Sequence, residues 1–288
     1  MQKLICAFSI LVLLSACNST PDTRNGNNNV LLQPTASLEQ FSDSLVRLNS
    51  FAPTGIEKSA MYFEDLVPAD STLADSAAVI LLQYMRRIVD TVDAKLYKDT
   101  ANYFNLAYGG GEPLSEKEKR YQQYLASHHL NLQGDGEGGV LVVLDYDWVN
   151  AIVQPKTSAA VDAYLMLLGE EKRAPALLDA GLAIDMKDLI SRLLSSEKLI
   201  SEKLPRPFSE DIALKNRFYT NALLLGSDNT PSIDYNYIIL TPEFKEAYTY
   251  LLEAYPSSKA AQKVKEWMAI VKRKDKRKID EMRAAAYQ

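Results

Sequence analysis

The chain has 288 residues, with 47 % apolar residues, 24 % charged residues and a net charge of −5. This length and composition are typical of a globular protein with a sizeable core and one or two domains. The charge balance argues against nucleic-acid binding, which requires clustered cations. Two histidines and two cysteines are too few for a Cys/His zinc site or a disulfide-rich module, and we expect no cofactor.

The N-terminus has the pattern of an export signal. Lys3 precedes an apolar run over residues 4–14, and Ser15 and Ala16 are the small residues that a signal peptidase requires near its cut. The run is shorter than the about 20 apolar residues that a transmembrane helix needs. We therefore expect these residues to direct export.

The residues before the second cysteine refine this expectation. Leu14-Ser15-Ala16-Cys17 resembles the lipobox of bacterial lipoproteins. The resemblance implies that residues 1–16 are a removed signal peptide, that the Cys17 sulfur receives a diacylglyceryl group, and that an acyl chain such as palmitate is added to the new amine. Two or more chains anchor a protein stably, whereas one binds a membrane only marginally. An ordinary secretory signal and an uncut membrane anchor are the alternatives.

Residues 17–36 are expected to be the lipidated cysteine and a flexible tether. They are rich in Asn, Ser, Thr, Pro and Gly and show no helical period. No acidic run follows Cys17, and the next residue is Asn18 rather than Asp. By analogy with known sorting signals, this favours the outer membrane of a bacterial envelope, and it leaves open whether the protein faces the periplasm or the cell surface.

The remainder of the sequence has helical periodicity. Apolar residues three or four apart predict a mainly α, irregular multi-helix body over residues 37–288, with a sub-boundary near 145–157 left open. The longest predicted helix covers residues 72–97, and Ser37 with Gln40 forms a predicted capping box at the start of the first helix. The other predicted helices cover residues 115–127, 148–154, 157–168, 175–183, 185–203, 209–225, 241–255 and 257 to the end.

One β-hairpin is predicted near residues 128–145, with a glycine-rich turn at 134–139. The turn does not match a nucleotide loop, because it lacks lysine and because Asp135 and Glu137 would repel phosphate. A calcium site is an alternative, but the EF-hand spacing is absent. A solvated hairpin turn is therefore the favoured interpretation.

Two carboxylates and an indole follow the hairpin. Asp145 and Asp147 would face one side of an extended chain beside Trp148, as paired carboxylates and an aromatic platform do in glycosidases. The favoured interpretation is structural, with Asp145 ending the strand and Asp147 capping the next helix. The glycan-active or glycan-binding alternative also draws on tyrosines near predicted loops, namely Tyr62, Tyr103, Tyr108, Tyr235 and Tyr237.

A short C-terminal segment resembles the junction between helices in tetratricopeptide-like repeats. The matching residues are Ala247, Leu251, Tyr255-Pro256, Ser258, Ala261 and Val264. The resemblance occurs once and implies a helical hairpin, with solenoid-like packing near the C-terminus. A helical hairpin that arises by chance explains the same residues, and no functional residue is inferred from the resemblance.

The last 30 residues are basic. Residues 259–288 hold ten Lys or Arg and four Asp or Glu, a net charge of +6, whereas residues 17–258 carry −12. The densest cations are Lys272, Arg273, Lys274, Lys276, Arg277 and Lys278. Such a helix can face anionic headgroups or an acidic partner, and the alternative is an ordinary solvated helix surface.

No catalytic motif is apparent. Neither H-E-x-x-H nor G-x-S-x-G occurs, and the adjacent His128 and His129 cannot chelate one metal ion on a helix or a strand. The loop at 228–231 is interpreted as an Asx-type turn, with ligand binding as the alternative. The sequence therefore favours a lipid-anchored binding or scaffold module of the envelope, with an envelope protein as partner, over an enzyme.

Overall fold

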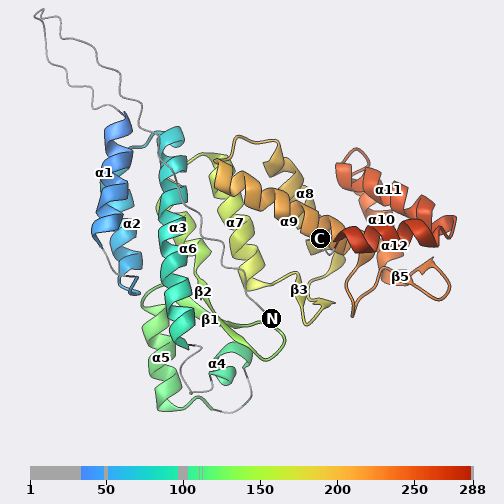
Figure 1. The fold of residues 1–288 in the computed structure, drawn as a ribbon, viewed down its shortest axis with the longest axis horizontal. Helices are drawn as coiled ribbons and strands as arrows, with labels where there is room; N and C mark the ends of the chain where they lie inside the picture. The colour runs from blue at the N-terminus through green and yellow to red at the C-terminus, as the bar shows by residue number, and fades with distance from the viewer. Residues whose placement is uncertain (1–33, 49–50, 97–102, 110, 112, 287–288) are drawn as a thin grey trace, which may run out of the picture. The chain divides into compact units, whose positions relative to one another are not determined.

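The computed structural model of the chain describes residues 34–48, 51–96, 103–109, 111 and 113–286. These residues fold mainly as helices (Figure 1), which confirms the predicted mainly α, irregular multi-helix class. The predicted signal peptide, Cys17 and most of the tether lie outside the described residues. No helix in this described part is long and apolar enough to cross a membrane.

The helices and strands follow one another along the chain. The helices are α1 (Pro34–Arg47), α2 (Gly55–Leu66), α3 (Ser71–Leu96), α4 (Phe104–Tyr108), α5 (Glu116–Ala126), α6 (Tyr146–Val153), α7 (Ala159–Arg173), α8 (Met186–Ile200), α9 (Arg206–Leu225), α10 (Pro242–Ala254), α11 (Lys259–Lys272) and α12 (Lys276–Ala286). The strands are β1 (Leu130–Gly134), β2 (Val140–Leu144), β3 (Leu177–Leu178), β4 (Gly181–Leu182), β5 (Ile233–Asp234) and β6 (Ile239–Leu240). The strands form three antiparallel hairpins, in which β1 pairs with β2, β3 with β4 and β5 with β6.

The long helix α3 is central to the first half of the core. Its predicted apolar stripe is confirmed, since Leu81, Met85 and Ile88 are fully buried. Both α1 and α2 pack against α3, and the rings of Phe41 and Phe63 meet edge to face at 5.9 Å. The helix α1 begins at Pro34, so the prediction that its cap is at Ser37 was wrong.

The predicted hairpin of β1 and β2 is confirmed, with Leu132 opposite Val142 in its register. The strand β2 packs on α3, and the Val142 amide donates a hydrogen bond of 3.0 Å to the Asp93 carboxylate of that helix. The preceding helix α5 begins with a capping box, in which the Ser115 hydroxyl accepts from the Glu118 amide and the Glu118 carboxylate accepts from the Ser115 amide.

The helix predicted to end at Gly169 continues through that residue to Arg173. The glycine therefore does not terminate the helix. A Cβ at position 169 would lie 2.6 Å from Oδ1 of Asp147, so a larger residue here would require the Asp147 carboxylate to move.

The predicted helix over residues 175–183 was also wrong, because this segment forms the β3–β4 hairpin. Its two turn residues, Asp179 and Ala180, have φ values of 48° and 54°. Such a two-residue turn with positive φ reverses the chain between strands and cannot continue a helix.

The C-terminal helices also depart from the prediction at one point. The start of α10 at Thr241 and Pro242 is confirmed, and Ser258 caps α11 by accepting a hydrogen bond from the Ala261 amide. The predicted continuous helix from residue 257 is broken between α11 and α12, where Lys274 adopts a φ of 54°.

Candidate functional site

The aspartates after the hairpin have structural partners. The side chain of Asp145, not Asp147, caps α6, with Oδ1 accepting hydrogen bonds of 3.1 and 3.0 Å from the amides of Asp147 and Trp148. The predicted cap at Asp147 was therefore wrong by two residues. Instead, the Asp147 carboxylate pairs with Arg173 at the end of α7, and the Trp148 ring stacks on His129 with centroids 3.7 Å apart.

The glycine turn is closed by a tyrosine that the sequence did not connect to it. The amides of Gly136 and Gly138 both donate to the Tyr108 hydroxyl at 3.0 Å. The amides of Glu137 and Gly139 donate to Oδ1 of Asp135. The Glu137 amide contributes most to lowering the pKa of the Asp135 carboxyl. Because these donors point at groups of the chain itself, the turn does not present them to a phosphate.

The adjacent histidines point to different partners. The Nδ1 atom of His128 lies 2.6 Å from Oε1 of Glu57 in α2, whereas His129 covers Trp148. Across the described residues, no group of three or more His, Cys, Asp or Glu side chains could hold a metal ion.

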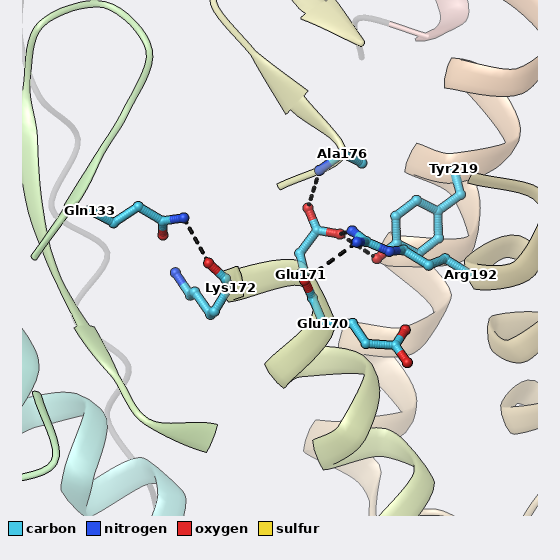
Figure 2. Close-up of polar contacts among 7 residues, drawn as sticks. All are labelled: Gln133, Glu170, Glu171, Lys172, Ala176, Arg192 and Tyr219. Carbon is cyan, nitrogen blue, oxygen red and sulfur yellow. Dashed lines mark hydrogen bonds and ion pairs between the residues drawn. The ribbon is translucent and has the colours of Figure 1, made fainter. Parts of the chain in front are cut away.

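A buried polar cluster at the end of α7 is shown in Figure 2. The Glu171 carboxylate accepts hydrogen bonds from Arg192 (2.8 Å), Tyr219 (2.7 Å) and the Ala176 amide (3.0 Å). Burial and the charge of Glu171 raise the pKa of Tyr219. Because both carboxylate oxygens have donors from the chain, this cluster joins α7, α8 and α9 rather than offering a vacant site.

The neighbouring Lys172 has a different environment. Its backbone carbonyl accepts a 2.7 Å hydrogen bond from Gln133 of β1, which is also visible in Figure 2. Desolvation of its ammonium, with the charges of Lys215 and Arg86, lowers the pKa of Lys172. The sequence could not suggest this cluster of cations, because its members come from α3, α7 and α9.

A groove on the C-terminal helices is the arrangement that best fits a binding site. It has a volume of about 660 Å³, and we call it the lysine-rimmed groove. Its lining residues are Ile238, Ile239, Leu240, Lys245, Leu252, Lys265, Met268, Ala269, Val271, Lys272 and Lys274. Seven of these are apolar and four are lysines, so no carboxylate contributes to the lining.

The groove is built by the β5–β6 hairpin, α10 and α11. Ile238 adopts a φ of 52° before β6, a conformation that is rare for a β-branched residue. The next side chain, Ile239, is 52 % exposed. Lys265 and Lys272 are seven residues apart on α11, which places both on one face of that helix.

The structure divides the six predicted cations into three groups of two. Lys272 and Lys274 line the groove. On α12, Lys276 pairs with Asp280 at 2.7 Å and Arg277 with Glu281 at 3.8 Å. The remaining two, Arg273 and Lys278, are exposed and do not line the groove.

Sequence reasoning missed the other two lysines of the groove. The seven-residue spacing from Lys272 is a signal that could have identified Lys265. No local pattern points to Lys245, because it reaches the groove from a different helix.

Comparison with protein-family models, curated proteins and solved structures found no match for this chain.

Proposed function

We propose that this chain is a lipid-anchored binding or scaffold protein of a bacterial envelope. Its lysine-rimmed groove would bind an acidic, amphipathic segment of another envelope protein. One observation carries this proposal: an apolar groove floor bordered by four lysines, none of which forms an ion pair with any described residue.

The composition of the groove favours a partner with two kinds of surface. Apolar side chains of the partner would lose their contact with water against Ile239, Leu252 and Met268, which supplies affinity. The lysines would favour carboxylates at the edges, and such charge complementarity mainly increases the association rate and the specificity. Because salt screens exposed charges beyond roughly 8–10 Å, binding should weaken as the salt concentration rises.

The anchor rests on the lipobox resemblance at Cys17. A diacylglyceryl group together with an amide-linked acyl chain would hold the body at the membrane, where an envelope partner is concentrated. Mass spectrometry of the protein isolated from membranes tests this directly. We expect an N-terminal Cys17 with covalent lipid, and a Cys17→Ser variant without it. An unmodified Cys17 in the isolated protein would contradict the anchor.

Two variants with equal charge loss test the groove. The first replaces the groove lysines 245, 265, 272 and 274 by Gln. The control replaces Arg273, Lys276, Arg277 and Lys278, which lie outside the groove lining, by Gln. A synthetic amphipathic helix of Leu and Glu is the probe, and a helix of Leu and Lys is its charge-reversed counterpart.

We expect the Leu/Glu helix to bind the parent chain and the control alike, and to bind the groove variant about tenfold or more weakly. Equal losses in both variants would show that only net charge matters and would contradict the proposal. Binding of anionic vesicles in preference to the Leu/Glu helix would instead assign the groove to the membrane surface and overturn the choice of a protein partner.

A further inference from the structure

A second hollow lies beside α9, and we call it the arginine cavity. Its volume is about 550 Å³. It is bordered by the second half of α9, the loop that follows, the β3–β4 hairpin and α12. This volume lies within the range of about 300–1,000 Å³ that is typical of small-molecule sites.

One face of α9 supplies the apolar wall. Leu214, Phe218, Ala222 and Leu225 recur at spacings of four, four and three residues, so they form one stripe along the helix. Leu214 is 57 % exposed and Phe218 is 38 % exposed, although both are large apolar side chains. The part of the stripe nearest the start of α9 is therefore left in contact with water instead of being covered by another described element.

Two arginines reach the same cavity from different helices. Arg217 on α9 forms no ion pair with any described residue. The Arg283 guanidinium on α12 lies over the Tyr235 ring at 4.3 Å from its centroid, a contact that orients it. Asp228 is the one carboxylate in the lining, so the lining carries a net positive charge.

We propose that the arginine cavity binds a small amphiphile with an acidic head, either a carboxylate or a phosphate monoester. The apolar body lies along the α9 stripe, and the head lies between Arg217 and Arg283. Arginine suits this role because its planar guanidinium donates two parallel hydrogen bonds to such oxygens. This site is separate from the lysine-rimmed groove, with which it shares no lining residue.

Calorimetric titration of the full chain in lipid nanodiscs tests this, with empty nanodiscs subtracted. The probes share one alkyl chain: octanoate, octyl phosphate and neutral 1-octanol. We expect saturable binding of one acidic probe per chain and about tenfold weaker binding of 1-octanol. The stronger of the two acidic probes identifies the head group. Equal affinity for 1-octanol and both acids, or no saturable binding, would overturn the proposal.

Matched variants locate the site. Arg217→Gln and Arg283→Gln should each weaken binding of the acidic probe about fivefold or more. Arg206→Gln is the control, because Arg206 is on the same helix but 88 % exposed and outside the cavity. An equal loss in Arg206→Gln, or unchanged affinity in both cavity arginine variants, would contradict the assignment.

Discussion

At the scale of single residues, the position of a helix cap depends on where the preceding strand ends. The strand β2 ends at Leu144, so the first residue outside it, Asp145, takes the extended conformation that a cap requires. Asp147 already lies inside the first turn of α6. Two aspartates separated by one residue look equivalent in sequence, and only the end of the strand distinguishes them.

This assignment predicts unequal effects of two alanine substitutions. Asp145→Ala should lower the free energy of unfolding by about 0.5–2 kcal/mol, because it removes a cap. Asp147→Ala removes only an exposed ion pair with Arg173 and should cost about 0–1 kcal/mol. Denaturant unfolding of both variants measures the difference. A greater loss in Asp147→Ala would show that the cap has been assigned to the wrong residue.

The partly buried carboxylate of Glu171 gives a second prediction at this scale. Glu171→Ala should cost about 3 kcal/mol, because it leaves the Arg192 guanidinium, which is 5 % exposed, with the Glu170 carbonyl as acceptor and no opposite charge. The exposed neighbour provides the control, and Glu170→Ala should cost no more than about 0.5 kcal/mol. The double change Glu171→Leu with Arg192→Met should recover part of the loss. If the single Glu171 variant is as stable as the control, the cluster does not hold the three helices together.

At the scale of elements, the sequence predicts those whose patterns are long and local. The α3 stripe was identified because it repeats along the helix, and β2 was identified because five β-favouring apolar residues follow a glycine-rich turn. The helix α2 was not among the predicted helices. The β3–β4 hairpin was misassigned, because its turn has Asp179 and Ala180 where the common signal is Asn-Gly or Asp-Gly.

The lysine-rimmed groove and the arginine cavity were also hard to predict from sequence, because their residues do not lie in one local pattern. Part of the basic rim was predicted, because Lys272 and Lys274 lie within one run of cations. The groove itself was not, since its floor combines a hairpin and two helices. The arginine cavity was not predicted at all, because Arg217 and Arg283 are 66 positions apart in the chain.

The closure of the glycine turn by Tyr108 gives a prediction for one element. Tyr108→Phe should lower the free energy of unfolding by about 0.5–1.5 kcal/mol and increase amide exchange at residues 134–140, because the Gly136 and Gly138 amides lose their acceptor. Tyr124→Phe is the matched control, since this hydroxyl makes no hydrogen bond with any described residue. Unchanged exchange in the Tyr108 variant would indicate that the turn keeps its shape without the hydroxyl.

At the scale of the whole molecule, buried tyrosines connect stability to alkaline pH. Burial is the main cause that raises the pKa of Tyr164, Tyr219 and Tyr248 well above the ordinary value of 10.0. In the unfolded chain these phenols ionise near pH 10, whereas in the folded chain they stay protonated. Their contribution to stability is therefore fully present below pH 10 and is lost as the pH rises above it.

We expect the free energy of unfolding to fall steadily above about pH 10. Tyrosinate absorbance should show the exposed phenols, such as Tyr237 at 66 % exposure, ionising first. The three buried phenols should ionise only when the chain unfolds. If all tyrosines titrate together below the unfolding transition, these three are not enclosed as described.

The central claim is that the lysine-rimmed groove binds an acidic protein segment in the envelope. A photo-crosslinking amino acid placed at Ile239, inside the groove, tests it in living cells, with Arg277 on α12 as the control position. We predict a covalent adduct with a protein from position 239 alone, and its loss when the groove lysines 245, 265, 272 and 274 are replaced by Gln. Equal adducts from both positions, or an adduct that persists without the lysines, would contradict the account.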